Sequence, residues 1–175
     1  MAKLRKASAY RKVERPYTRK SKYRAKSYVR ANPHNLVVKY EMGDTTREFP
    51  VRVQLRSKVP IQIRHNALES ARKSANRVLE TTLGKKSYRF RIKAIPHHIL
   101  RENPLASGAG ADRMSTGMKM SFGKSIGLAA RLRAGQTIIE IGCEEKDLAV
   151  AKTAAERANH KFACSTRIVV ERKTV

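Results

Sequence analysis

The sequence is poor in acidic residues, cysteine and aromatic side chains, and it has no tryptophan. Its 175 residues include 14 Asp and Glu against 39 Lys and Arg, which gives a net charge of +25. A small soluble domain ordinarily carries a net charge of about 2 to 8, so the surplus here points to a polyanionic partner. Nucleic acid is the first candidate.

Two further absences exclude whole classes of protein. Cys143 and Cys164 are the only cysteines, which is too few for a four-ligand zinc site or a disulfide framework. No apolar run approaches the ~18 residues of a membrane span, and residues 1–6 are not followed by an apolar signal region. We therefore expect a soluble intracellular protein that holds no metal and no cofactor.

The positive charge is concentrated at the N-terminus. Residues 1–30 contain 12 Lys and Arg and a single acid, Glu14, together with four of the six tyrosines. Cations neutralise phosphates, and tyrosine rings and arginine planes stack on bases, so this combination suits RNA. Residues 1–34 are predicted to form an RNA-binding arm that has no apolar period and becomes ordered only when phosphates neutralise it. Its candidate RNA-binding residues are Lys3, Arg5, Lys6, Tyr10, Arg11, Lys12, Arg15, Tyr17, Arg19, Lys20, Lys22, Tyr23, Arg24, Lys26 and Arg30.

Residues 35–175 have the pattern of a single α+β domain. Helical spacing predicts helices over 66–83 and 144–159, the first with Asn66 and Glu69 as a capping box and Gly84 as its stop. Strand-rich blocks punctuated by two helices indicate a mixed, mostly antiparallel sheet with both helices packed on it. The strands are predicted from short apolar or alternating runs at 36–40, 49–55, 59–64, 88–94, 99–100, 128–132, 137–141 and 166–171.

Two parts of this domain extend the cationic surface. In residues 88–94 apolar side chains alternate with Arg89, Arg91 and Lys93, which predicts a strand with one cationic face. A long glycine-rich loop follows at about 101–127, where a flexible backbone can approach a phosphate chain closely. The candidate RNA-binding residues in and after this loop are Arg101, Arg113, Lys119, Lys124, Arg131 and Arg133.

The apparent catalytic motifs fail on spacing. Gly123-Lys124-Ser125 looks like the end of a phosphate-binding loop, but the first glycine of that motif should stand where Met118 is. His97 and His98 point to opposite faces of an extended segment and lack a third metal ligand, and no carboxylate pair suits acid–base catalysis. We therefore expect no enzyme, while an RNA-dependent or nucleotide-hydrolysing enzyme and a DNA-architectural protein stay open as alternatives.

The loop, its flanks and the arm resemble a known family, and the resemblance covers essentially the whole chain. The matching residues are Ala109-Gly110-Ala111-Asp112-Arg113, Thr116-Gly117-Met118, Phe122-Gly123-Lys124, Gly127, Ala130-Arg131 and Gly135-Gln136, with Tyr10-Arg11 and Pro16-Tyr17 in the arm. This pattern is similar to that of the large-subunit ribosomal protein sixteen family (universal numbering), archaeal and eukaryotic form, traditionally called ribosomal protein ten-e. The chain ends at Val175 without the extended C-terminal region of eukaryotic members, and its arm has no cysteine, so the archaeal form is expected.

The resemblance implies an α/β-hammerhead fold and a structural role on large-subunit ribosomal RNA in cytoplasmic ribosomes. It also implies a position beside the aminoacyl-tRNA path near the peptidyl-transferase centre, where the protein supports subunit assembly and tRNA positioning. The implied partners are ribosomal RNA, neighbouring ribosomal proteins and aminoacyl-tRNA, with no membrane and no small-molecule substrate. The family's long loop points toward the peptidyl-transferase region, which would carry that role onto residues 102–117. The tRNA-path residues would then be Ser107, Gly108, Gly110, Asp112, Arg113 and Gly117.

Overall fold

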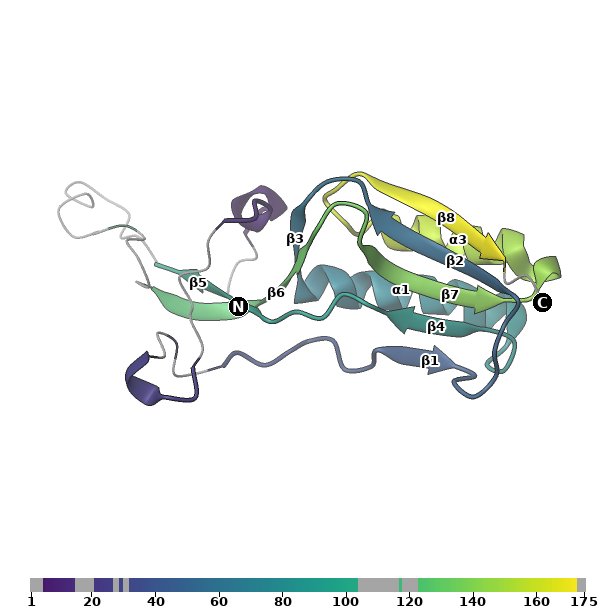
Figure 1. The fold of residues 1–175 in the computed structure, drawn as a ribbon, viewed down its shortest axis with the longest axis horizontal. Helices are drawn as coiled ribbons and strands as arrows, with labels where there is room; N and C mark the ends of the chain where they lie inside the picture. Colours follow the sequence, from purple (N-terminus) through teal and green to yellow (C-terminus); the bar gives the residue numbers. More distant parts are fainter. Residues whose placement is uncertain are drawn as a thin grey trace.

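The fold consists of two antiparallel sheets and two α-helices. It was obtained as a computed structural model of residues 1–175, and it describes residues 5–14, 21–26, 29, 32–103, 117 and 123–172. Figure 1 shows an elongated molecule in which a five-stranded sheet lies in front of both helices, with a smaller sheet beside it. The prediction of an α+β fold with two packed helices is confirmed, and all the strand pairs of the described residues are antiparallel.

The five-stranded sheet has the strand order β1-β4-β7-β2-β8. Alternation in the sequence determines its two faces, since successive side chains of a strand point to opposite sides. In β2 the apolar residues Val51, Val53 and Leu55 are buried, whereas Arg52 and Arg56 are only partly buried on the other side. The strands are β1 (Glu41–Gly43), β4 (Arg89–Ile92), β7 (Thr137–Cys143), β2 (Val51–Ser57) and β8 (Thr166–Arg172).

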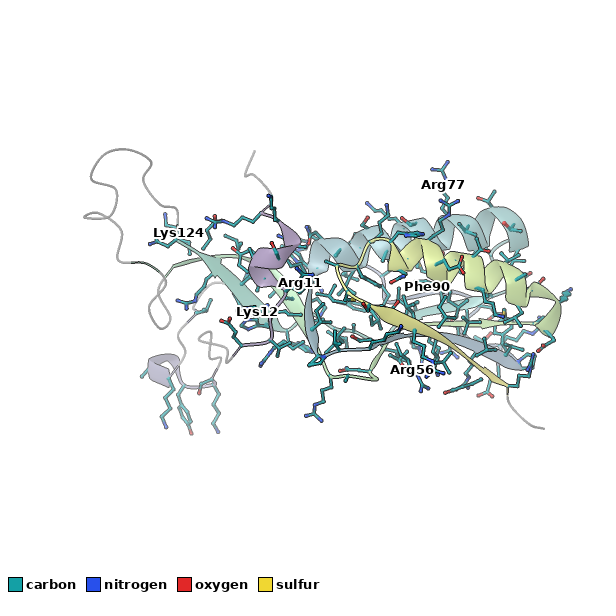
Figure 2. All side chains as sticks on the ribbon, turned by 90° about the horizontal axis from the view of Figure 1, so that it is seen from above. Arg11, Lys12, Arg56, Arg77, Phe90 and Lys124 are labelled. Carbon is teal, nitrogen blue, oxygen red and sulfur yellow. The ribbon has the colours of Figure 1, made fainter. Side chains whose placement is uncertain are left out.

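Both helices cover the same face of this sheet, as the view from above shows (Figure 2). They are α1 (His65–Leu83) and α3 (Leu148–Asn159), the second preceded by the 3-10 turn η3 (Glu145–Asp147). The buried face of α3 consists of Ala151, Ala154, Ala155 and Ala158, and such small side chains allow α3 to lie close to α1 and the sheet. Phe90 of β4 is fully buried between the layers.

A three-stranded sheet, in the order β3-β6-β5, continues the fold on the side away from the C-terminus (Figure 1). Its strands are β3 (Ile61–Arg64), β6 (Lys124–Leu132) and β5 (His98–Glu102). Because β3 leads directly into α1, the small sheet is joined to the helix layer at residues 64–65. Neither of the helices in the described residues has the length and apolar character that crossing a membrane requires.

The predicted strand at 36–40 is wrong, because the first strand is β1 and it covers part of the predicted turn. Leu36 and Val38 are 45% and 74% exposed, so of this apolar run only Val37, which is buried, and Tyr40, which is partly buried, pack in or against the core. The segment is held by single contacts instead, such as the 2.8 Å hydrogen bond from the Ile92 amide to the Tyr40 carbonyl.

The predicted capping box at the start of α1 is also wrong. The helix begins at His65, and the Asn66 side chain accepts a hydrogen bond from the adjacent Ala67 amide at 3.0 Å. Glu69 does not reach back to the helix start, because the Arg72 guanidinium binds both of its carboxylate oxygens at 2.8 and 2.6 Å. The predicted stop at Gly84 is confirmed, with a φ of 78°.

Candidate nucleic-acid interface

The first part of the arm is docked on the three-stranded sheet. Residues 5–14 contain the 3-10 turn η1 (Ala7–Tyr10) and lie along the free edge of β3. The Gln62 amide donates to the Arg11 carbonyl at 3.0 Å, and the Gln62 side chain donates to the Tyr10 carbonyl at 3.0 Å. The arm thereby covers the edge of β3, which would otherwise present unpaired backbone groups.

Two arginines of the small sheet hold the ends of this docked segment. Arg64 donates to the Arg5 carbonyl at 2.9 Å, and its guanidinium lies 5.7 Å from the centre of the Tyr10 ring. Arg131, on the neighbouring strand β6, donates to the Glu14 carbonyl at 2.8 Å. Arg131 was predicted to bind RNA, and the structure shows its guanidinium bound to the arm.

One acidic residue adds to the docking of the arm. Glu102 of β5 forms an ion pair with Arg5, and the nearby Tyr10 hydroxyl donates to the Arg101 carbonyl at 3.5 Å. Burial, and secondarily the Glu102 charge, raise the pKa of Tyr10, which keeps the phenol protonated as a donor. The expectation that the arm gains order only from phosphate neutralisation is thus wrong for residues 5–14, because backbone carbonyls of the arm supply acceptors for protein donors.

Docking leaves the lysines of this segment free to meet a partner. Lys6 and Lys12 are exposed, and their ammonium groups have no recorded contact within the described part of the chain. Arg11 is exposed as well and makes one long hydrogen bond, 3.5 Å, to the Ala163 carbonyl (Figure 2). The segment therefore carries its charge on the surface while its backbone is held.

A second arm segment combines an aromatic ring with two cations. The 3-10 turn η2 (Arg24–Lys26) follows Tyr23, whose side chain is 56% exposed. The Lys22 and Lys26 ammonium groups lie 5.0 and 5.4 Å from the centre of the Tyr23 ring. An exposed ring beside two cations can stack on a base while the cations meet phosphates.

The predicted cationic face of β4 lies on the side of the large sheet that no helix covers. Arg89 and Arg91 contact the Glu41 carboxylate at 3.4 and 2.6 Å. The hydrogen bond from Arg91 is the main cause that lowers the pKa of Glu41. The Lys93 ammonium lies 3.8 Å from Glu140. These pairs leave an excess of positive charge on the face.

Sequence reasoning missed three further arginines on this face. Arg52 and Arg56 of β2 and Arg167 of β8 point to the same side as Arg89, because cross-strand partners share a face. The signal was present, since Arg52 and Arg56 alternate with the apolar residues of β2. Arg56 binds the Gln54 side chain and pairs with Glu171, whereas Arg52 has no recorded partner among the described residues.

The cations around the long loop are placed at the ends of β6. Lys124 begins the strand and pairs in register with Glu102, and it lies at the far end of the small sheet in Figure 2. Arg133 follows the other end of β6 and is exposed. The ends of the predicted loop at 101–127 belong to β5 and β6, and between these strands the structure describes Asn103, Gly117 and Gly123. Gly117 has a φ of 74° and a carbonyl that accepts from the Asn103 side chain at 3.4 Å.

Many predicted site residues lie outside the described residues. Their part in binding stays a prediction, as does that of Arg24, whose backbone alone is described. They are Lys3, Arg15, Tyr17, Arg19, Lys20, Arg30, Arg113 and Lys119 of the RNA-binding set, and Ser107, Gly108, Gly110 and Asp112 of the loop set.

The described residues contain no cluster of His, Cys, Asp or Glu that could hold a metal ion. Cys143 is fully buried in the core, and burial raises the pKa of its thiol to about 11, so it stays protonated and unreactive near neutral pH. Burial, followed by Arg131, lowers the pKa of His98. Cationic and aromatic side chains on the arm and on both sheets are therefore the groups that can act on a partner.

Comparison with known proteins matches residues 12–169 to the family described as ribosomal protein L16p/L10e. The large ribosomal subunit protein uL16 of Methanococcus maripaludis strain S2 is 49% identical over 168 residues, which cover 95% of this chain and 94% of the relative. The uL16 protein of Archaeoglobus fulgidus is 41% identical over 166 residues, or 95% and 92% of the two chains. That of Methanocella arvoryzae is 45% identical over 150 residues, or 86% and 87%.

These matches confirm the resemblance drawn from the loop and arm residues, and the relatives named here are archaeal. The matched region begins within the docked part of the arm and ends in β8, so it includes both sheets and both helices. The chain belongs to the ribosomal protein L16p/L10e family.

Proposed function

We propose that the protein is a structural constituent of the large ribosomal subunit and binds ribosomal RNA through its arm and the cations of its two sheets. As a ribosomal protein it is a structural component and not an enzyme. Ribosomes are cytoplasmic, so the protein works there, beside ribosomal RNA and neighbouring ribosomal proteins.

The observation that carries this proposal is the docked arm. Its backbone is held by Gln62, Arg64 and Arg131, while Lys6 and Lys12 face outward. The arm then loses less conformational entropy on binding RNA than a free tail would, because contacts within the protein already order part of it. The net charge of +11 in residues 1–30 supplies the long-range attraction.

The finer part of the proposal concerns the aminoacyl-tRNA path. The family resemblance assigns residues 102–117 to a loop that approaches the peptidyl-transferase region. The placement of its flanks supports this assignment, because β5 ends at Glu102 and β6 begins at Lys124 at the tip of the small sheet, far from the helix layer (Figure 1). The loop is therefore attached at the end of the fold that lies away from the helices, and aminoacyl-tRNA is its proposed partner.

The salt dependence of RNA binding tests the role of the arm. Replacing Lys6, Lys12, Lys22 and Lys26 with Gln leaves the docking contacts intact and removes four cations. Each phosphate contact contributes about 0.7 to 0.9 to the slope of log affinity against log salt, so the loss of four contacts should lower the slope by up to about 3.6. The probe is the large-subunit RNA of Methanococcus maripaludis made by transcription.

The matched control replaces four exposed lysines at the other end of the molecule, Lys85, Lys86, Lys146 and Lys152, with Gln. The slope of this control should stay close to that of the unmodified protein. Equal losses in the two variants would show that the arm has no special part in binding. Salt-independent binding, or none, by the unmodified protein would contradict the proposed function itself.

A further inference from the structure

The uncovered face of the five-stranded sheet contains a small hollow of about 80 Å³ between β2, β4 and β7. Five cations and two acids line it, which leaves a net charge of +3. Its remaining walls are Phe49 and Gly142. The lining cations are Arg47, Arg52, Arg89, Arg91 and Lys93, and the acids are Glu48 and Glu140.

A glycine in the middle strand creates the space. Gly142 of β7 stands opposite Arg52 of β2 on one side and opposite Arg89 of β4 on the other. The two arginines are thus two strands apart, or about 9 to 10 Å between backbones, and the middle strand puts no side chain of its own between them. The Phe49 ring lies on Gly142, where an added Cβ would come within 3.3 Å of it, and it forms the apolar floor.

The arginines around this floor have donors to spare. Arg52 is half-buried and has no recorded partner in the described part of the chain. The Nε atom of Arg89 is buried and has no hydrogen-bond partner there either. A buried N–H group without an acceptor costs free energy, so an anion that accepts from this nitrogen and from Arg52 is favoured here.

The other cations of the hollow are engaged. Arg47 pairs with Glu144 and stacks at 5.2 Å on the Phe49 ring, while Lys93 is near Glu140. The Arg52 guanidinium and the Nε of Arg89, whose terminal nitrogen contacts Glu41 at 3.4 Å, are therefore the donors available to a ligand. Both can donate to it from opposite sides of Gly142.

We propose that this hollow binds a backbone phosphate of RNA, held between the Arg52 and Arg89 guanidinium groups. This site is a second RNA contact, on the five-stranded sheet, whereas the arm is docked on the three-stranded sheet. The inference rests on the proposed function. A chain of phosphates fits better than a single acidic side chain, because the cationic face continues beyond the hollow to Arg56 and Arg167. An acidic segment of a neighbouring protein is the competing occupant.

The test measures binding of the full chain to the transcribed large-subunit RNA of Methanococcus maripaludis as a function of salt. Arg52→Gln should lower the slope of log affinity against log salt by about 0.7 to 0.9 and weaken binding about tenfold. Arg52→Lys keeps the charge and loses the planar fork, so it should keep the slope and weaken binding by less. The matched control is Arg157→Gln, an exposed cation on α3 that should change neither quantity.

The outcomes separate this inference from the proposed function. If Arg52→Gln binds like Arg157→Gln while both keep the strong salt dependence of the unmodified protein, the phosphate site is wrong and the arm proposal stands. If Arg52→Gln does not fold, as thermal unfolding would show, the Arg52→Lys comparison decides, and unchanged affinity overturns the site.

Chemical footprinting identifies the occupant. Phenylglyoxal, which modifies exposed arginines, should react with Arg52 in the free protein and fail to react once RNA is bound. Protection of Arg52 in assembled subunits, without protection by RNA alone, would show a protein partner and overturn the assignment to RNA.

Discussion

Gly43 ends strand β1 in a conformation that residues with a side chain seldom adopt, with a φ of 83°. The Tyr88 carbonyl accepts a hydrogen bond from the next amide, Asp44, at 2.8 Å, so the chain passes very close to that oxygen. A Cβ at position 43 would lie 2.1 Å from it. Both the backbone angle and the contact therefore require glycine here.

Gly43→Ala should consequently destabilise the domain by more than the cost of the backbone angle alone. Gly135→Ala is the matched control, because Gly135 has a similar φ of 79° with nothing within 4 Å of an added Cβ. We expect about 1 kcal/mol for the control and at least about 2 kcal/mol more for Gly43→Ala, measured by urea unfolding. Equal losses would mean that the approach to Tyr88 is readily relaxed.

At the scale of elements, the docked arm segment is the feature that separates this chain from a domain with a loose basic tail. Gln62 is 8% exposed and bonds the arm through both its backbone and its side chain. Gln62→Ala removes the side-chain bond and leaves the Tyr10 carbonyl without its donor. Trypsin cleavage after Arg11 and Lys12 in the folded protein should then be about fivefold faster.

Lys58→Ala, an exposed change just before β3, is the control for this experiment and should leave the cleavage rate unaltered. Cleavage at the same rate in the unmodified protein and in Gln62→Ala would contradict docking in solution. The result bears on RNA binding as well, since a released arm must be ordered again by the RNA.

Local sequence patterns were sufficient to predict most helices and strands, but not which strands pair with one another. The alternation in β2 and β4 and the helical spacing of Leu68, Ala71, Ala75 and Leu79 predicted those elements, because burial of one face determines them. The division into two sheets was not predictable, since nothing local shows that β3 pairs with β6 and not with β2. The arm was misjudged for the same reason, because Gln62, Arg64 and Arg131 are remote in sequence.

At the scale of the whole molecule, the account gives two separate functions to different parts of the fold. The cations of the arm and sheets bind RNA, and the long loop acts in the tRNA path. Replacing residues 105–116 with a short Gly-Ser linker leaves the arm and the sheet cations in place. Subunits should therefore assemble and translate poorly, with defective maturation or tRNA accommodation, as measured by peptide synthesis with purified subunits. Normal translation by subunits shown to contain the shortened protein would contradict a role of the loop in the tRNA path.

A single cation of this loop should have a smaller effect. Arg113→Ala removes one phosphate or base contact while the loop remains, so translation should decline less than with the linker. Arg157→Ala, an exposed cation on α3 that belongs to no candidate binding set, is the matched control and should preserve translation. An equal decline in both variants would mean that general loss of charge, and not the loop, is responsible.

The central claim is that the protein is held in the large ribosomal subunit chiefly by the cations of its arm. The most direct measurement is sedimentation of a cell extract through sucrose gradients of increasing salt, with the protein followed by antibody. The account predicts that the unmodified protein travels with large subunits. The arm variant, with Lys6, Lys12, Lys22 and Lys26 changed to Gln, should be released at lower salt than the control variant, with Lys85, Lys86, Lys146 and Lys152 changed to Gln. Recovery of the unmodified protein at the top of the gradient, or release of both variants at the same salt, would contradict it.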